Sequence, residues 1–407
     1  MATAVGTSEP NDPELAETAW DLEPLVDGEG EAGVQSRLED ALGRARAFAE
    51  RYAGKLSELD SAGLAEAMTE LAVIYELIGR AGTYAALRFS TDTAAPENGA
   101  LLQQVQERET EIATTLLFFE LEWAALSDER AGELLAGEGL DFCRHYLRNA
   151  RRYREHLLTE PEEKILAEKS LTGAGAWSRL FEELTSAIEV RLPGKGGSPD
   201  ASGQSEEDGS TDKGEAPRAG EAPQAVETVA LDVALSNLMS GDRDLRRSTA
   251  EAVSAALEPG LRTRAFLFNT LLADKATDDR LRRYPSWLAA RNLSNEASEE
   301  SVQALIEAVR GRNEIARRWY RLKARLLGVE QLADYDRRAA VTEDEVTFSF
   351  AEGREIVLDC YDSFSPELGA LAKRFFDERW IDGPVRPGKR GGAFCASAVN
   401  RATCACW

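Results

Sequence analysis

The sequence is poor in histidine: His145 and His156 are the only two among 407 residues. Zinc peptidases commonly hold their metal with two histidines four residues apart on one helix, where an adjacent glutamate serves as general base. His145 and His156 lie eleven residues apart within a helix that we expect from Leu140 to Leu158. At ~1.5 Å rise per residue they would stand about 16 Å apart. They cannot share one metal ion, and a His-Glu-x-x-His motif is absent from these residues.

The sequence also has no surplus of positive charge. It carries 48 lysines and arginines against 72 acidic residues, a formal net charge of −24. Nucleic-acid binders need a basic surface to displace counterions from phosphates, so we expect no nucleic-acid partner. One basic cluster stands out, and we interpret it as a solvated, salt-bridged helix face rather than an anion site. Its members are Arg144, Arg148, Arg151, Arg152 and Arg154.

Long apolar runs are missing too. No stretch approaches the roughly 18 apolar residues of a membrane span, and the first residues show no secretory signal. We therefore expect a cytoplasmic protein without a membrane partner. The five cysteines are an odd number and predict reduced thiols. Cys404 and Cys406 have no second ligand pair nearby, so a structural zinc site is not indicated.

Helical periodicity dominates what is present. Apolar residues recur every three or four positions, as in Leu64, Met68 and Leu71, and Thr159 with Glu162 forms a capping-box helix start. The expected helices cover residues 31–53, 61–87, 96–125, 140–158, 177–185, 245–257, 261–274, 298–327, 350–364 and 366–379. Alternating stretches at 187–192 and 226–231 predict a β-hairpin. The segment 194–223 between them is rich in Gly, Ser, Pro and acidic residues, which predicts an unstructured insertion.

The segment from Gly388 to Ser397 changes the pattern. Its double glycine enters a short apolar run, which predicts a turn followed by an extended strand. A strand of this kind could align a peptide by backbone hydrogen bonds, or it could be a buried packing strand. The candidate substrate-binding residues are Gly391, Gly392, Ala393, Phe394 and Cys395. We predict no catalytic and no metal-binding residues elsewhere.

Several stretches resemble, in order and spacing, the oligoendopeptidase F family of zinc metallopeptidases, which is related to thimet oligopeptidase. They are Trp20–Leu25, Tyr146–Arg148, Glu162–Leu166, Trp177–Phe181, Leu271–Asn292, Tyr335–Asp336 and Gly388–Cys395. Each is weak alone, and their collinearity over roughly residues 20–399 carries the resemblance. It implies a mainly α fold: a two-lobed helical zincin-type peptidase body, incomplete here, with a small β-hairpin and a terminal edge strand. It also implies zinc-dependent hydrolysis of short peptides.

The resemblance implies that a His-Glu-x-x-His helix should follow Gly388–Cys395 within a few tens of residues, and no such motif follows here. We therefore expect a chain truncated before its zinc site, by a true lesion or a frameshift, that binds no zinc and is inactive alone. Two alternatives remain open: a non-catalytic helical peptide-binding or interaction protein, and one half of a split peptidase completed by a separate C-terminal chain.

This interpretation also predicts how the chain is divided. We expect an unstructured N-terminus at residues 1–18, an N-terminal helical lobe at 19–192, a disordered acidic insertion at 193–226, the helical start of a catalytic lobe at 227–399, and an atypical tail at 400–407. Short peptides are the expected ligands. Their sequence preference, the oligomeric state and the role of the insertion are not indicated by the sequence.

Overall fold

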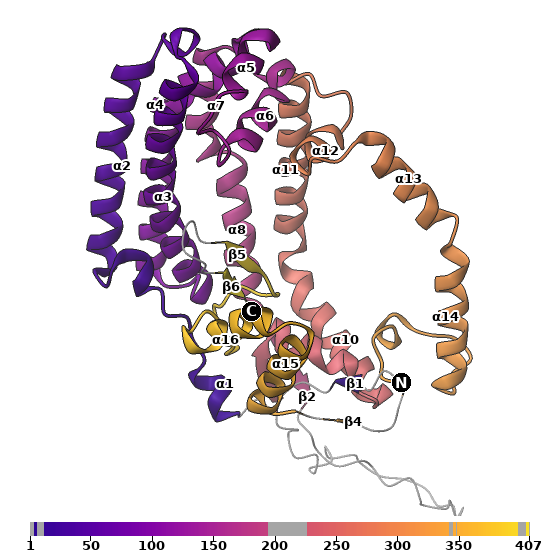
Figure 1. The fold of residues 1–407 in the computed structure, drawn as a ribbon. Helices are drawn as coiled ribbons and strands as arrows, with labels where there is room; N and C mark the ends of the chain where they lie inside the picture. Colours follow the sequence, from indigo (N-terminus) through magenta and orange to yellow (C-terminus); the bar gives the residue numbers. More distant parts are fainter. Residues whose placement is uncertain are drawn as a thin grey trace, which may run out of the picture.

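The fold is mainly helical, as expected (Figure 1). The computed structural model describes residues 4–5, 12–193, 226–341, 345–346, 348–397 and 404–406. Strands within these ranges form three small two-stranded sheets. The described helices include none with the length and apolarity that a bilayer span requires.

Three long helices form the main core: α2 (Gly30–Tyr52), α3 (Ser61–Thr91) and α4 (Pro96–Ala125). Asp60 caps α3 by accepting a hydrogen bond from the Gly63 N–H, and Pro96 occupies the first turn of α4, where its missing N–H costs nothing. The apolar stripes of the three helices face one another around buried residues such as Phe48 and Trp123. Core packing, rather than a binding groove, therefore accounts for these stripes.

Three shorter helices continue at the upper end of this bundle: α5 (Asp128–Leu135), α6 (Arg144–Arg151) and α7 (Glu160–Ser170) (Figure 1). Helix α8 (Ala174–Ser186) runs downward from them (Figure 1). The helix start at Thr159 is confirmed, because Glu162 accepts hydrogen bonds from the Thr159 N–H and hydroxyl. The single helix expected over 140–158 is wrong. It is replaced by α6 and a separate 3-10 turn at Arg154–His156, so the two histidines lie on different elements.

The predicted hairpin is confirmed. Strands β2 (Glu189–Pro193) and β3 (Val226–Ala230) pair antiparallel, with Glu189 opposite Ala230. Val190 and Leu192 are buried in a small second core with residues of α9 (Leu231–Ser236) and α10 (Arg243–Leu257). The insertion predicted to be disordered, residues 194–223, lies outside the described residues.

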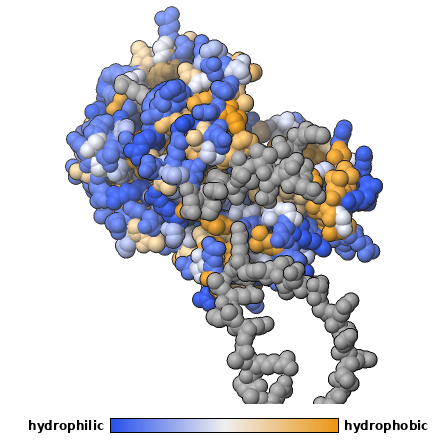
Figure 2. Space-filling model, turned by 90° about the horizontal axis from the view of Figure 1, so that it is seen from below, coloured by the Kyte–Doolittle hydropathy of each residue, from blue (hydrophilic) through white to orange (hydrophobic). Residues whose placement is uncertain are grey.

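Beyond the hairpin, α11 (Leu261–Leu281) runs beside α8, and α12 (Ala289–Ser294), α13 (Glu299–Arg310) and α14 (Asn313–Leu326) arch away from it (Figure 1). The single helix expected over 298–327 breaks at Gly311, a residue with low helix propensity. Much of α13 and α14 presents apolar side chains to solvent, and Figure 2 shows apolar surface on this side of the molecule. The exposed apolar side chains of α13 and α14 are Leu305, Val309, Ile315, Trp319, Tyr320, Leu322 and Leu326.

The first helix packs against helices from the last part of the sequence. Helix α1 (Pro13–Glu17) contacts α15 (Phe350–Phe364), which packs on α16 (Pro366–Asp377). Asp12 caps α1 and also accepts a 2.6 Å hydrogen bond from the Phe350 N–H. This double role orders residues 13–17, which we expected to be unstructured. Two further sheets are present. One pairs β1 (Ala4–Val5) with β4 (Glu345–Val346), and the other pairs β5 (Cys395–Ser397) with β6 (Cys404–Cys406). Strand β6 lies within residues 400–407, the tail that we expected to be atypical.

Candidate functional site

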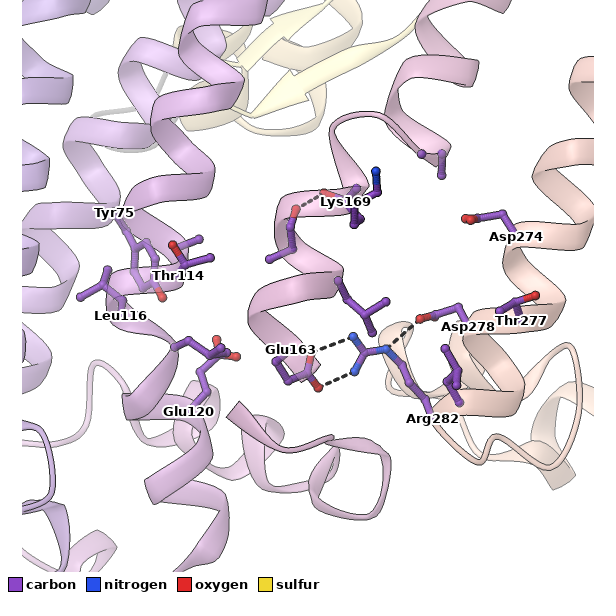
Figure 3. Close-up of a pocket in the computed structure, with 18 residues that line it drawn as sticks. Tyr75, Thr114, Leu116, Glu120, Glu163, Lys169, Asp274, Thr277, Asp278 and Arg282 are labelled. Atoms are coloured by element: carbon purple, nitrogen blue, oxygen red, sulfur yellow. Dashed lines mark hydrogen bonds and ion pairs between the residues drawn. The ribbon is translucent and has the colours of Figure 1, made fainter. Parts of the chain in front are cut away.

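A pocket of about 420 Å³ opens between α4, α7 and α11 (Figure 3). Side chains of Leu116, Leu166 and Leu281 contribute to its apolar walls. Its polar lining comes from Tyr75 of α3, Glu120 of α4, Glu163 and Lys169 of α7, Asp274 and Asp278 of α11, and Arg282 at the C-terminal cap of α11. An apolar cavity with a few convergent polar groups is the usual form of a small-ligand site.

A buried ion pair spans one side of the pocket. Arg282 donates hydrogen bonds of 2.7 and 2.9 Å to the two carboxylate oxygens of Glu163, and a third of 3.0 Å to Asp278 (Figure 3). Burial alone would raise the pKa of Glu163, but the hydrogen bonds from Arg282 and from the Leu158 N–H outweigh it and hold that pKa below its usual value. Both residues therefore stay ionised and tie α7 to α11.

Glu120 lies across the pocket from this pair. Its carboxylate points into the cavity, and no hydrogen bond or ion pair engages it among the described residues (Figure 3). Burial raises its pKa, and the nearby negative charge of Glu163 raises it further. Asp274 faces the cavity from the α11 side. Glu120 and Asp274 therefore give the pocket negative charge that forms no ion pair with Lys169 or Arg282.

A second carboxyl group with an unusual environment lies on the same helix. Glu109 precedes Glu120 by eleven residues, about three turns of α4, so the two share one face. A Cβ on Gly82 would clash with Oε1 of Glu109, so the absence of a side chain at Gly82 makes room for this carboxyl group. Burial raises the pKa of Glu109 to about 7.

The two histidines serve separate local roles. His156 stacks on Tyr284 with ring centroids 4.0 Å apart, and its Nδ1 lies 2.9 Å from the carbonyl oxygen of Arg282. Since a carbonyl only accepts, Nδ1 is the donor of this bond. His145 is exposed, and its Nε2 lies 2.9 Å from Oε1 of Glu296. Across the ranges that the structure describes, no three His, Cys, Asp or Glu residues are grouped to hold a metal. The donors present do not fit a catalytic zinc.

Three of the five arginines of the basic cluster, Arg144, Arg151 and Arg154, form salt bridges, as interpreted from the sequence, but the Arg151 side chain is only 11% exposed and not solvated. Arg151 and Arg154 both reach Asp128, at 2.7 and 2.9 Å, and Arg144 pairs with Asp141. Arg151 also donates to the carbonyl oxygen of Trp123 at 2.7 Å. The contacts of Arg151 and Arg154 join the C-terminal end of α6 and the 3-10 turn after it to the end of α4 and the start of α5.

The glycine-rich segment lies apart from the pocket, and none of its candidate residues lines it. Gly391, Gly392 and Ala393 are exposed rather than buried, and only Cys395 belongs to strand β5. Phe394 packs edge-on against Trp20, with centroids 6.1 Å apart. Gly392 has a φ of +82°, which breaks the extended run that we expected over this segment. A peptide-aligning role of these residues stays a prediction.

The preceding loop is fixed to the N-terminal helices. The Thr93 N–H donates to the carbonyl oxygen of Gly388 at 2.8 Å, and the Arg390 N–H donates to that of Ser90 at 2.9 Å. Lys389 is buried, pairs with Asp382 at 3.2 Å and donates to the carbonyl oxygen of Pro384. Burial lowers the pKa of Lys389. This loop therefore joins segments almost 300 residues apart in the sequence.

Sequence reasoning missed Glu109 and Glu120, and it did not distinguish Asp274 within the stretch Leu271–Asn292, because nothing separates these residues from the other acidic residues of this chain. It did single out the stretches that contain Glu163, Arg282 and Tyr284. The structure brings these weak motifs together, since Glu162–Leu166 and Leu271–Asn292 meet through the Glu163–Arg282 pair. Tyr335–Asp336 similarly meets α10, where Arg246 donates to Asp336 at 2.8 Å.

Comparison with known proteins agrees with this arrangement. A family model described as Oligopeptidase F matches residues 122–189. The chain is 23% identical to Oligopeptidase PepF of Bacillus subtilis over 353 residues, which cover 86% of this chain and 48% of that protein. It is 24% identical to Group B oligopeptidase PepB of Streptococcus agalactiae over 322 residues, covering 78% and 49%. The chain thus spans about half the length of these relatives.

The fold is shared with solved structures of the same group. Oligoendopeptidase-F from Enterococcus faecium superposes with a TM-score of 0.65 at 19% identity, covering 86% of this chain and 66% of that one. The collinear sequence matches, the family model and the common fold confirm the resemblance seen in the sequence. The chain is thus similar to the oligoendopeptidase F-like peptidases in sequence and in fold.

Proposed function

We propose that this chain binds short peptides as the helical body of an oligopeptidase. The observation that supports this most is the pocket between α4, α7 and α11, whose apolar walls and convergent carboxylates lie within an oligoendopeptidase F-like fold. Peptide ligands offer apolar side chains and charged groups, and such a cavity has partners for both.

We further propose that these 407 residues do not hydrolyse peptides by themselves. Zinc-dependent cleavage would need the two-histidine motif, and the two histidines of this chain are bound to Glu296 and to the Arg282 carbonyl group. Zinc, the cofactor implied by the family resemblance, accordingly has no fitting donor set among the described residues.

The test combines binding with turnover. The purified chain is titrated with a set of short peptides by calorimetry, and the mixtures are then analysed for cleavage products with and without a chelator. We expect saturable binding and intact peptides. Chelator-sensitive cleavage would overturn the proposed lack of activity, while absence of any peptide binding would overturn the proposed function itself.

One observation favours the split-peptidase alternative. The apolar side chains that α13 and α14 expose form a face larger than isolated surface residues explain. A second chain that bears a His-Glu-x-x-His helix would cover this face and supply the missing metal site. Co-expression with such a chain should then give a co-purifying complex with chelator-sensitive peptidase activity, and two chains that elute separately would exclude this alternative.

A further inference from the structure

We propose that the pocket between α4, α7 and α11 binds a cationic group at the end of a short aliphatic stem, as the lysine side chain of a peptide provides. The inference rests on the proposed peptide-binding function and names the chemistry that this pocket selects. It is carried by the placement of Glu120 and Asp274 on opposite walls of an apolar cavity (Figure 3).

The charges of the lining favour a cation. Four carboxylates, those of Glu120, Glu163, Asp274 and Asp278, face two cationic side chains, Lys169 and Arg282. Arg282 is already committed, because its guanidinium donates to Glu163 and Asp278. The remaining Lys169 sits on an exposed part of α7. Two carboxylates therefore face the cavity against one uncommitted lysine, and an incoming ammonium group would restore the balance.

The environment of Glu120 makes this pairing favourable. Glu120 is exposed, and no hydrogen bond or ion pair engages its carboxylate among the described residues, so an incoming cation would not have to displace a partner. Desolvation and the negative charge of Glu163 raise the pKa of Glu120. A bound ammonium group would donate hydrogen bonds to this carboxylate and lower that pKa.

The apolar walls of the pocket suit the aliphatic stem of the ligand. Leu116 and Leu117 of α4, Leu166 of α7 and Leu281 of α11 line the cavity, together with small residues that keep it open. Methylene groups of an aliphatic stem would lie against these side chains while the ammonium group reaches Glu120. The volume of about 420 Å³ lies near the lower end for small-ligand sites, which suits one side chain rather than a whole peptide.

The test compares two short peptides that differ in one residue, lysine or norleucine. Norleucine keeps the aliphatic stem and removes the ammonium group, so the pair isolates the charge. Affinities are measured by calorimetry for the unaltered chain and for Glu120→Gln, Asp274→Asn and Glu107→Gln. Glu107 lies on the same helix, is exposed, and does not line the pocket, which makes it the matched control.

We expect the lysine peptide to bind the unaltered chain about tenfold more tightly than the norleucine peptide. Glu120→Gln should abolish most of that difference, Asp274→Asn should reduce it, and Glu107→Gln should preserve it. Glu120 and Asp274 are both exposed, so neither substitution should impair folding, and the two variants test the site independently. Thermal melting of each variant establishes that the chain is folded.

The outcomes separate the two proposals. Equal affinities of both peptides for every variant would overturn the cation site and leave peptide binding standing. If neither peptide binds, the proposed function fails as well. Cadaverine, a free diamine with the same stem, forms a third arm: binding of the peptide above that of cadaverine identifies a side chain as the ligand, whereas cadaverine alone would reassign the site to a free amine and overturn the peptide source.

Discussion

The carboxylate of Glu163 holds the guanidinium group of Arg282 by two hydrogen bonds, 2.7 and 2.9 Å long, across the gap between α7 and α11. The side chain of Glu163 is only 9% exposed and that of Arg282 is 23% exposed. A bidentate pair of this kind fixes both distance and orientation. It therefore sets the width of the pocket beside it.

Replacing Glu163 by glutamine should destabilise the chain by about 2 kcal/mol, because Arg282 would lose its main partner in a partly buried position. Asp278 limits the loss, since it still accepts one hydrogen bond from Arg282. Urea unfolding measures the change. The control is Lys164→Gln, which breaks an exposed pair with Glu160 on the same helix and should cost below about 0.5 kcal/mol. Equal effects of the two variants would contradict a structural role of the Glu163–Arg282 pair.

Asp336 is expected to be the most sensitive acidic residue. Its fully buried carboxylate accepts hydrogen bonds from Arg243, Arg246 and the Ala333 N–H, and Arg246 is itself only 1% exposed. Asp336→Asn would leave the Arg246 charge buried without its partner, so we expect a loss of about 3 kcal/mol in unfolding free energy. Arg243 is 44% exposed, and Arg243→Gln should cost below about 1 kcal/mol. A larger loss for Arg243→Gln would contradict this ranking.

The same residue predicts sensitivity to acid. Burial would raise the pKa of Asp336, but its hydrogen bonds with both arginines outweigh burial and lower the pKa from 3.8 to about 2. Because the folded-state pKa is depressed, its stabilisation is complete above the unfolded-state pKa and is lost as the pH falls from about 3.8 through about 2. Asp336→Asn should therefore flatten the fall in stability across that range, as urea unfolding at several pH values would show.

Glu109 predicts the opposite pH dependence. Burial raises its pKa from 4.5 to about 7, so the folded state binds a proton more tightly than the unfolded state does. Stability from this group is therefore present below about pH 4.5 and is lost as the pH rises to about 7. Glu109→Gln should stabilise the chain on the order of 2 kcal/mol at pH 8 and little at pH 4.

Melting temperatures at the two pH values test this prediction, and Glu107→Gln on the same helix is the control. A pH-independent difference between Glu109→Gln and the unaltered chain would show that Glu109 does not titrate differently on folding.

The two histidines should differ in their contribution to stability. His156→Ala removes the stacking on Tyr284 and the hydrogen bond to the Arg282 carbonyl group, and we expect a loss of about 1–2 kcal/mol. The His145 side chain is 79% exposed, so His145→Ala should change stability by below about 0.5 kcal/mol. A chelator should leave the melting temperatures of the unaltered chain, His156→Ala and His145→Ala unchanged. A lower melting temperature in the presence of chelator would reveal a bound structural metal.

The helices could largely be predicted from the sequence, because their apolar periodicity and caps are local signals. The interval 350–364 matches α15 in full, and the start at Thr159 is confirmed by its capping hydrogen bonds. Errors arose where a local break interrupted a continuing apolar pattern, as at Gly311 and around Arg152. Helix α1 was missed because its order depends on Phe350, which is remote in the sequence.

The pocket could not be predicted, since its residues come from five helices and do not belong to one common motif. Glu120 and Asp274 gain their significance from facing the same cavity, and that depends on packing between α4, α7 and α11. The motif residues Glu163 and Arg282 were visible as a resemblance, but their pairing was not. A charge partner more than a hundred residues away leaves no periodic signal.

The pairing of β5 with β6 sets a condition for any extended ligand at the glycine-rich segment. One edge of Cys395–Ser397 already makes its backbone hydrogen bonds within the chain. A peptide that binds at that edge would have to displace β6, which belongs to the same chain and is joined to β5 by a short connection. Short tethers give effective concentrations in the millimolar range, so a peptide present at micromolar levels would displace β6 only if side-chain contacts add to its backbone pairing. Competition with β6 would therefore raise the peptide concentration that half-occupies this edge.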